Sequence, residues 1–164
     1  MSEAITVQWV EEEDSLVGKY LTFLIEKETY GIPIQHVIEI IGIQRITEVP
    51  DLPVYAKGII NLRGKIIPVI DVRLKFRKPE KDYNDRTCII VVDINEIAIG
   101  LIVDTVAEVL SIADENIVPP PELKSGFGNR YIKGIGKVGD EVKLLIDCER
   151  ILENEELEVI SDMG

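Results

Sequence analysis

Short apolar runs rich in β-branched and aromatic residues, separated by turn-forming residues, follow one another along most of the chain. Residues Tyr20–Ile25 predict a β-strand, Glu28–Gly31 a turn and Ile32–Ile34 a second strand. The apolar positions within 35–41 fit either a short helix or a strand, and their spacing does not decide between the two. Two prolines predict a loop over 47–53, because proline biases the residue before it away from the helical basin.

A hairpin and a capped helical turn are predicted next. Lys57–Leu62 and Lys65–Ile70 flank Arg63-Gly64, and glycine readily takes the positive φ that a tight turn requires. Asp71 is a good N-cap for a single helical turn over 72–76. The sequence therefore predicts two paired strands that expose the turn at Arg63.

The pattern then repeats after a polar linker over 77–86. Strands are predicted over Thr87–Val92 and Ile97–Val103, with a turn at Asp93–Asn95 between them. The two halves of the sequence align with each other and indicate an internal duplication. Aligned residues are Gly31 with Gly100, Val37 with Val106, Glu39 with Glu108, Tyr55 with Tyr131, and Asp71 with Asp147.

The duplication predicts two similar units, at about 18–84 and 85–152, within one domain over 18–154. Short strands with little room for long helices favour small closed barrels, which leave no exposed sheet edge. The expected fold class is mainly all-β, with two small barrels packed together, short helical turns and a binding groove between the barrels. Residues 1–17 are expected to form a loosely held arm and 155–164 an acidic tail.

Composition and charge exclude several kinds of partner. The 164 residues carry a formal charge of −12, whereas nucleic-acid binding needs a face rich in lysine and arginine. The apolar runs are far shorter than a membrane-spanning helix, so insertion into a membrane is not expected. With no secretory signal at the start, Cys88 and Cys148 are expected to be free structural thiols of a cytoplasmic protein.

The residues that could carry chemistry do not form an active-site pattern. His36, the only histidine, has no cysteine or histidine at metal-ligand spacing, so neither a metal nor a cofactor is expected. Gly134–Gly139 matches the G-x-G-x-x-G dinucleotide motif, but the strand-like run Asp140–Ile146 follows it where that motif needs a helix. These glycines are therefore expected in a hairpin, and the equivalent residues Asp71 and Asp147 are explained by capping.

Two charged positions remain as candidates for an interaction site. Arg63 is predicted at a hairpin tip, and arginine is common at interface centres because its planar fork pairs with carboxylates. A solvated turn residue is the equally weighted alternative. Glu39, between Ile38 and Ile40, is either a surface residue or one end of a salt bridge.

Several of these segments together resemble the CheW family of bacterial chemotaxis coupling proteins. The resemblance extends from about Lys19 to Leu152, and its most specific part is the Asn-Leu-Arg-Gly turn at Asn61–Gly64, followed by Asp71-Val-Arg73. The other segments that carry it are Tyr30–Ile32, Glu39-Ile40, Asp82–Asp85 and Gly100–Asp104.

The resemblance implies two interlocked five-stranded SH3-like barrels that act as an adaptor and not as an enzyme. The adaptor would link the cytoplasmic tip of a transmembrane chemoreceptor to the regulatory domain of the histidine kinase CheA, within receptor arrays at the membrane. Arg63 and Glu39 would form a functional pair, and Val37 and Val106 would supply apolar contact. The receptor-binding groove would use Val37, Glu39, Gly58, Arg63, Gly100 and Val106.

Two other functions stay open. The same fold serves as a coupling domain of CheA-type kinases and of adaptors fused to a receiver domain, but the near-complete fit of the chain to one pair of units argues against both. A small ligand-binding barrel or enzyme is suggested only by the glycine-rich hairpin and the paired aspartates. Saturable binding of a nucleotide would be the test of this last alternative.

Overall fold

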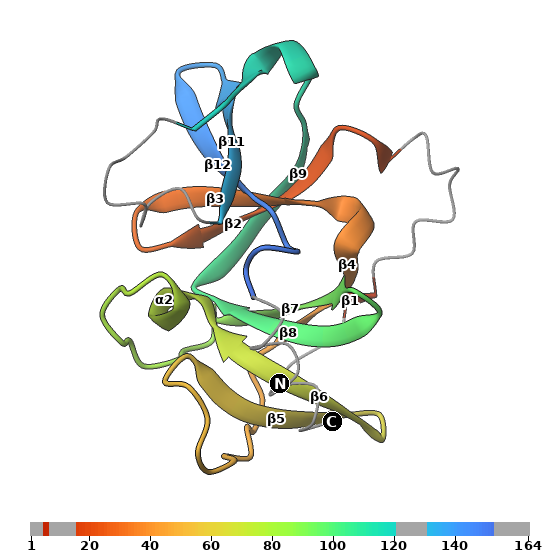
Figure 1. The fold of residues 1–164 in the computed structure, drawn as a ribbon, viewed down its shortest axis with the longest axis vertical. Coiled ribbons are helices and arrows are strands. Elements are labelled where there is room, and N and C mark those ends of the chain that lie inside the picture. The colour runs from red at the N-terminus through yellow and green to blue at the C-terminus, as the bar shows by residue number, and fades with distance from the viewer. Residues whose placement is uncertain (1–4, 7–15, 121–130, 153–164) are drawn as a thin grey trace.

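Two six-stranded sheets make up most of the protein (Figure 1). The computed structural model describes residues 5–6, 16–120 and 131–152, so most of the predicted arm over 1–17 and the whole tail over 155–164 lie outside the described residues. The first sheet has the order β1 (Ile5–Thr6), β4 (Val37–Gly42), β7 (Cys88–Ile94), β8 (Ile97–Val103), β6 (Lys65–Asp71) and β5 (Ala56–Leu62). The second has the order β10 (Ile117–Val118), β11 (Ile132–Val138), β12 (Glu141–Ile146), β3 (Glu28–Pro33), β2 (Lys19–Ile25) and β9 (Thr105–Ser111).

The strand order confirms the internal duplication. Strands β4, β7, β8, β6 and β5 of the first sheet correspond, in that order, to β9, β2, β3, β12 and β11 of the second. The single parallel contact in each sheet is equivalent as well, since Val69 pairs with Gly100 in one and Leu145 with Gly31 in the other. The predicted mainly all-β architecture is therefore confirmed, with the same five-strand arrangement formed twice.

Each sheet takes strands from both halves of the sequence, so the two halves are interlocked (Figure 1). The hairpin β2–β3 lies in the second sheet, and the chain then passes through a 3-10 turn, η1 (Ile34–His36), into β4 of the first sheet. The step from β8 to β9 makes the reverse crossing. The boundary predicted near residue 84 therefore does not separate the two sheets, because local patterning identifies a strand but not the sheet that it joins.

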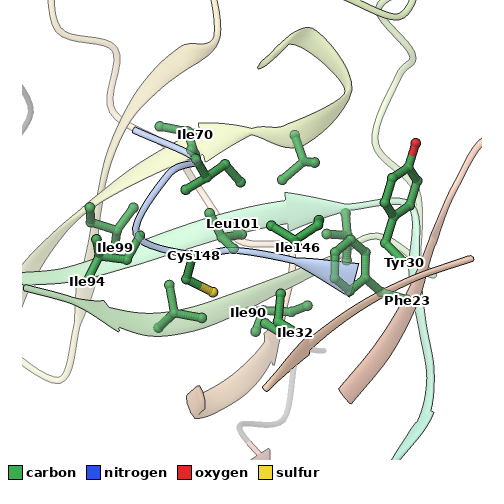
Figure 2. Packing of buried hydrophobic residues seen from close by; sticks show 14 of the residues in the cluster. Phe23, Tyr30, Ile32, Ile70, Ile90, Ile94, Ile99, Leu101, Ile146 and Cys148 are labelled. Carbon is green, nitrogen blue, oxygen red and sulfur yellow. The ribbon is translucent and has the colours of Figure 1, made fainter. Parts of the chain in front are cut away.

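One large hydrophobic core joins the two sheets (Figure 2). Phe23 and Ile32 from the second sheet point into the same cluster as Ile90 and Leu101 from the first, and all four are fully buried. Burying a side chain of this size contributes about 1.5–3 kcal/mol to stability. Because the cluster draws on both sheets, the sheets share one core.

The second predicted hairpin and its cap are confirmed. The β5–β6 hairpin closes at Arg63-Gly64, where φ is 51° and 85°. Asp71 is the N-cap of the short helix α2 (Val72–Lys75) and accepts a hydrogen bond from the backbone N–H of Leu74 at 3.4 Å. For the segment 35–41, helix and strand were both possible. Its first two residues belong to the 3-10 turn η1, and the remaining residues belong to β4.

The turn predicted at Glu28–Gly31 is wrong. Strand β3 already begins at Glu28, which pairs with Ile25. The chain reverses at Glu26, whose φ of 59° gives the left-handed conformation of a two-residue turn. The wrong prediction followed from Gly31, which serves here as a strand residue beneath the side chain of Leu145 and not as a turn residue.

Both cysteines are free, and their burial makes a testable prediction. Burial, followed by the nearby charge of Asp147, raises the pKa of Cys148 to about 12, and burial also raises the pKa of the half-buried Cys88. At pH 8 the thiolate fraction of Cys148 is then about 10⁻⁴. In a titration with a coloured disulfide reagent, we expect Cys88 to react first and Cys148 only after denaturant is added. A Cys88→Ser variant should show no fast phase, and rapid reaction of two thiols in the native protein would contradict the prediction.

Candidate functional site

The six predicted site residues come mostly from the first sheet. Val37 and Glu39 lie on β4, Gly58 on β5, Gly100 on β8, and Arg63 in the β5–β6 turn, whereas Val106 lies on β9 of the second sheet. Among these six, Glu39 and Arg63 form an ion pair, and the other four have different surroundings.

Glu39 and Arg63 form an ion pair between β4 and the β5–β6 hairpin turn. The Glu39 side chain is only 4% exposed, whereas that of Arg63 is 61% exposed, so a buried carboxylate holds a guanidinium at the surface. The turn that carries Arg63 is fixed by Asn61, whose side-chain oxygen accepts the N–H of Gly64 at 2.8 Å. Oε2 of Glu39 is buried without a hydrogen-bond partner among the described residues, so the carboxylate depends on Arg63 for its charge compensation.

The Glu39–Arg63 pair is present in only one of the two repeats. The duplication places Glu108 at the position of Glu39, but Gly139 stands at the turn position of Arg63 and has no side chain to offer. Glu108 is accordingly exposed, whereas Glu39 is buried. If the fold itself required this ion pair, we would expect it in both repeats. Because it occurs in one repeat only, the pair is a candidate for function.

The two predicted glycines have packing roles. A Cβ atom at Gly58, where φ is 143°, would lie 2.0 Å from the carbonyl oxygen of Thr47. A Cβ atom at Gly100 would lie 2.7 Å from side-chain atoms of both Ile89 and Val69. Both positions allow two segments to approach closely, and they shape the surroundings of β5 and β8 without offering a side chain to a partner.

The two predicted valines are buried or partly buried, and the sequence reasoning missed a neighbour that is more exposed. Val37 is 6% exposed and belongs to the main core, and the partly buried Val106 packs against the same core. Ile38 is 41% exposed, because the side chains of β4 alternate and those of Val37, Glu39 and Ile41 point inward. The pattern of apolar residues does not reveal this outward position, because Ile38 is as apolar as its buried neighbours.

A second polar cluster was also missed, although two of its residues, Arg73 and Asp104, lie in segments that carry the family resemblance. Arg73 of α2 is 7% exposed and donates to Oδ2 of Asp104 at 2.6 Å and to the carbonyl oxygen of Pro79 at 3.1 Å, and it also pairs with Glu26. Asp104 in turn accepts the backbone N–H of Glu26 at 2.9 Å. We call Arg73, Glu26 and Asp104 the arginine clasp, because it ties α2 to the β2–β3 turn and to the β8–β9 crossing.

Tyr83 extends this polar region. Its hydroxyl donates to Oδ2 of the buried Asp71 at 2.7 Å. Burial, with a further contribution from this hydrogen bond, raises the pKa of Tyr83, so the hydroxyl stays protonated and remains a donor at neutral pH. The space between these residues is only of the order of one water molecule, which leaves no room there for an organic ligand.

The described parts of the chain offer little for catalysis. No group of three or more histidine, cysteine or acidic residues that could hold a metal ion is found among residues 5–6, 16–120 and 131–152. The glycines at 134, 136 and 139 lie in the hairpin β11–β12, and a strand follows where a dinucleotide site needs a helix. Within the same residues, no helix is long and apolar enough to cross a membrane.

A buried carboxylate that holds an arginine at the surface, beside an exposed apolar residue on β4, is the kind of mixed polar and apolar surface by which β-rich scaffold proteins bind partners. The chain belongs to the CheW family: the CheW-like domain matches residues 19–156. The scaffold and adaptor role of that family agrees with the site described above.

Individual relatives support the same assignment. The chemotaxis protein CheW of Klebsiella aerogenes is 36% identical over 146 residues, which cover 89% of this chain and 88% of that protein. The chemotaxis protein CheW of Helicobacter pylori is 34% identical over 145 residues, covering 88% and 87%. The crystal structure of the scaffolding protein TtCheW from Thermoanaerobacter tengcongensis has 36% sequence identity and a TM-score of 0.78, covering 85% of this chain and 94% of that one.

Proposed function

We propose that this chain couples transmembrane chemoreceptors to the histidine kinase CheA, with residues 18–154 acting as one adaptor domain. Family membership supports the adaptor role. The observation that carries the proposed receptor site is the Glu39–Arg63 pair, which occurs in one repeat only and presents a guanidinium at the surface. The adaptor would work from the cytoplasm, in arrays of membrane-bound receptors.

The proposed receptor contact combines apolar packing with charge. The helical hairpin tip of a receptor would lay apolar side chains against β4, where Ile38 is exposed, and against the partly buried Val106 of β9. Arg63 would fix the register of the helix by pairing with an acidic or polar group on it. Of the six predicted residues, Arg63 and Val106 would then contact the receptor, while Val37, Glu39, Gly58 and Gly100 would shape the surface. The regulatory domain of CheA would bind elsewhere on the sheets.

An Arg63→Asp variant tests this proposal. We expect binding to a soluble receptor-tip fragment to weaken by at least about tenfold, because charge reversal destroys complementarity at the contact. Binding to the CheA regulatory domain, measured separately by pull-down or titration, should be unchanged. The melting temperature should fall, because the buried Glu39 carboxylate loses its cation and meets a second negative charge, so both bindings are measured at a temperature at which the variant is folded. Lys65→Asp, a reversal at an exposed residue two positions away, is the matched control. If Arg63→Asp binds the receptor fragment as tightly as the unmodified chain does, the site assignment is wrong.

A further inference from the structure

The equivalent strands β4 and β9 differ in what lies beside them. β1 pairs antiparallel with the outer edge of β4, with Ile5 opposite Ile40 and Thr6 opposite Glu39. β9 is the last strand of the second sheet, and none of the strands in the described ranges pairs with its outer edge. Among the residues that the structure describes, the outer edge of β9 is therefore unpaired at the place where its counterpart carries an added strand.

The two edges are alike in sequence and in backbone irregularity. Val37–Ile41 reads Val-Ile-Glu-Ile-Ile, and Val106–Leu110 reads Val-Ala-Glu-Val-Leu. Each strand shifts register against its inner neighbour around the central glutamate. A bulge and a charged residue are common means of preventing an edge from pairing. The bulge and the glutamate do not prevent strand addition in this fold, because β4 has both features and still pairs with β1.

The backbone of β9 presents hydrogen-bonding groups to the open side. The N–H of Glu108 donates to the hydroxyl oxygen of Thr22 at 3.1 Å, and the carbonyl oxygen of Glu108 accepts from the same hydroxyl at 2.7 Å. Both groups of Glu108 therefore face β2. Because successive residues of a strand alternate in direction, the N–H and carbonyl of Val109 face the open edge, and the Val109 side chain is 41% exposed.

We propose that β9 accepts an extended segment of a partner protein as an added antiparallel strand, in the register that β1 takes on β4. The template for this segment is Ile5-Thr6, so the partner would place a β-branched apolar residue opposite Val109 and a small hydroxyl residue opposite Glu108. Main-chain hydrogen bonds would supply most of the affinity. The proposal goes beyond the receptor contact, since it uses the edge of β9 and not the Glu39–Arg63 pair.

A synthetic peptide covering residues 3–8, with both ends blocked, is the probe. In ¹⁵N NMR spectra of the full chain, we expect saturable shifts of the backbone amides of Ala107–Leu110. Two further peptides, N-methylated at Ile5 or at Thr6, separate backbone pairing from side-chain contact. One of them should lose the shifts and the other keep them, because only alternate amides of an added strand point toward the edge.

Two variants of Val109 complete the test. Val109→Pro removes the outward N–H and leaves the bonds of Glu108 to Thr22 in place, so peptide binding should be lost. Val109→Thr keeps the N–H and the β-branched shape and should bind as before. If Val109→Pro does not fold, the two N-methylated peptides still test backbone pairing, because their binding is measured on the unmodified chain. Absence of saturable shifts, shifts confined to Ile38–Ile41 of β4, or equal effects of both N-methyl groups would overturn the proposal.

Discussion

Gly58→Ala is expected to lower the free energy of unfolding by about 3 kcal/mol or more, because the added carbon meets backbone that has little freedom to move. The new Cβ would lie 2.0 Å from the carbonyl oxygen of Thr47, in a position that a φ of 143° already disfavours for any side chain. Thr47 is itself held there by backbone hydrogen bonds in both directions with Ile59, at 2.8 and 2.9 Å. Relief of the clash would therefore break the contact between β5 and the preceding loop.

Gly64→Ala is the matched control for this variant. Gly64 also has a positive φ, of 85°, but no atom lies within 4 Å of a Cβ built there. Only the conformational penalty of about 1–2 kcal/mol is expected. Urea unfolding of the two variants, with the m-values compared, measures the difference. Equal losses at 58 and 64 would show that the backbone angle, and not the approach of Thr47, makes glycine necessary.

Arg73→Leu is expected to cost about 3–5 kcal/mol, because it removes the cation of the arginine clasp and leaves the carboxylates of Glu26 and Asp104 facing each other. The guanidinium is 7% exposed and the Asp104 side chain 15%, whereas the Glu26 side chain is 37% exposed, so most of the loss is expected from the pair with Asp104. The clasp joins α2 and the β8–β9 crossing to the hairpin of the other sheet, so both sheets should loosen together.

Chemical denaturation of three further variants checks the role of the clasp. Lys81→Leu removes an exposed cation beside the same cleft and should change stability by no more than about 0.5 kcal/mol. Arg73→Lys keeps the charge but loses the fork that reaches three partners, so an intermediate loss is expected. Adding Asp104→Asn to Arg73→Leu should cost less than the sum of the two single changes. A loss below about 1 kcal/mol for Arg73→Leu would contradict the clasp as a stabilising element.

Local features of the fold were predictable because each depends on a few adjacent residues. The hairpin at Arg63-Gly64 and the cap at Asp71 both follow from turn and capping chemistry. The duplication was visible because equivalent glycines fill equivalent strand positions, as Gly31 and Gly100 do. The salt-bridge alternative for Glu39 proved to be the one that the structure adopts.

Features that depend on distant segments were not predictable. Arg73 meets Glu26 and Asp104, which are 47 and 31 residues away in the chain, and no local pattern brings them together. The register shift of β4 against β7 between Val37 and Glu39 also depends on the partner strand, so strand periodicity does not reveal it. The exchange of strands between the sheets is of the same kind, since it is decided by pairing and not by propensity.

The interlocked sheets bear on how this fold arises from a shorter chain. A segment ending at the linker near residue 84 would contain β2 and β3 but none of β9, β11 and β12, which complete their sheet. Such a half could complete its sheets only by exchanging strands with a second copy, as in a domain-swapped dimer. The present chain has the form of two such partners fused end to end. Fusion also frees each copy to diverge, and the result is visible where one hairpin turn carries Arg63 and its counterpart carries Gly139.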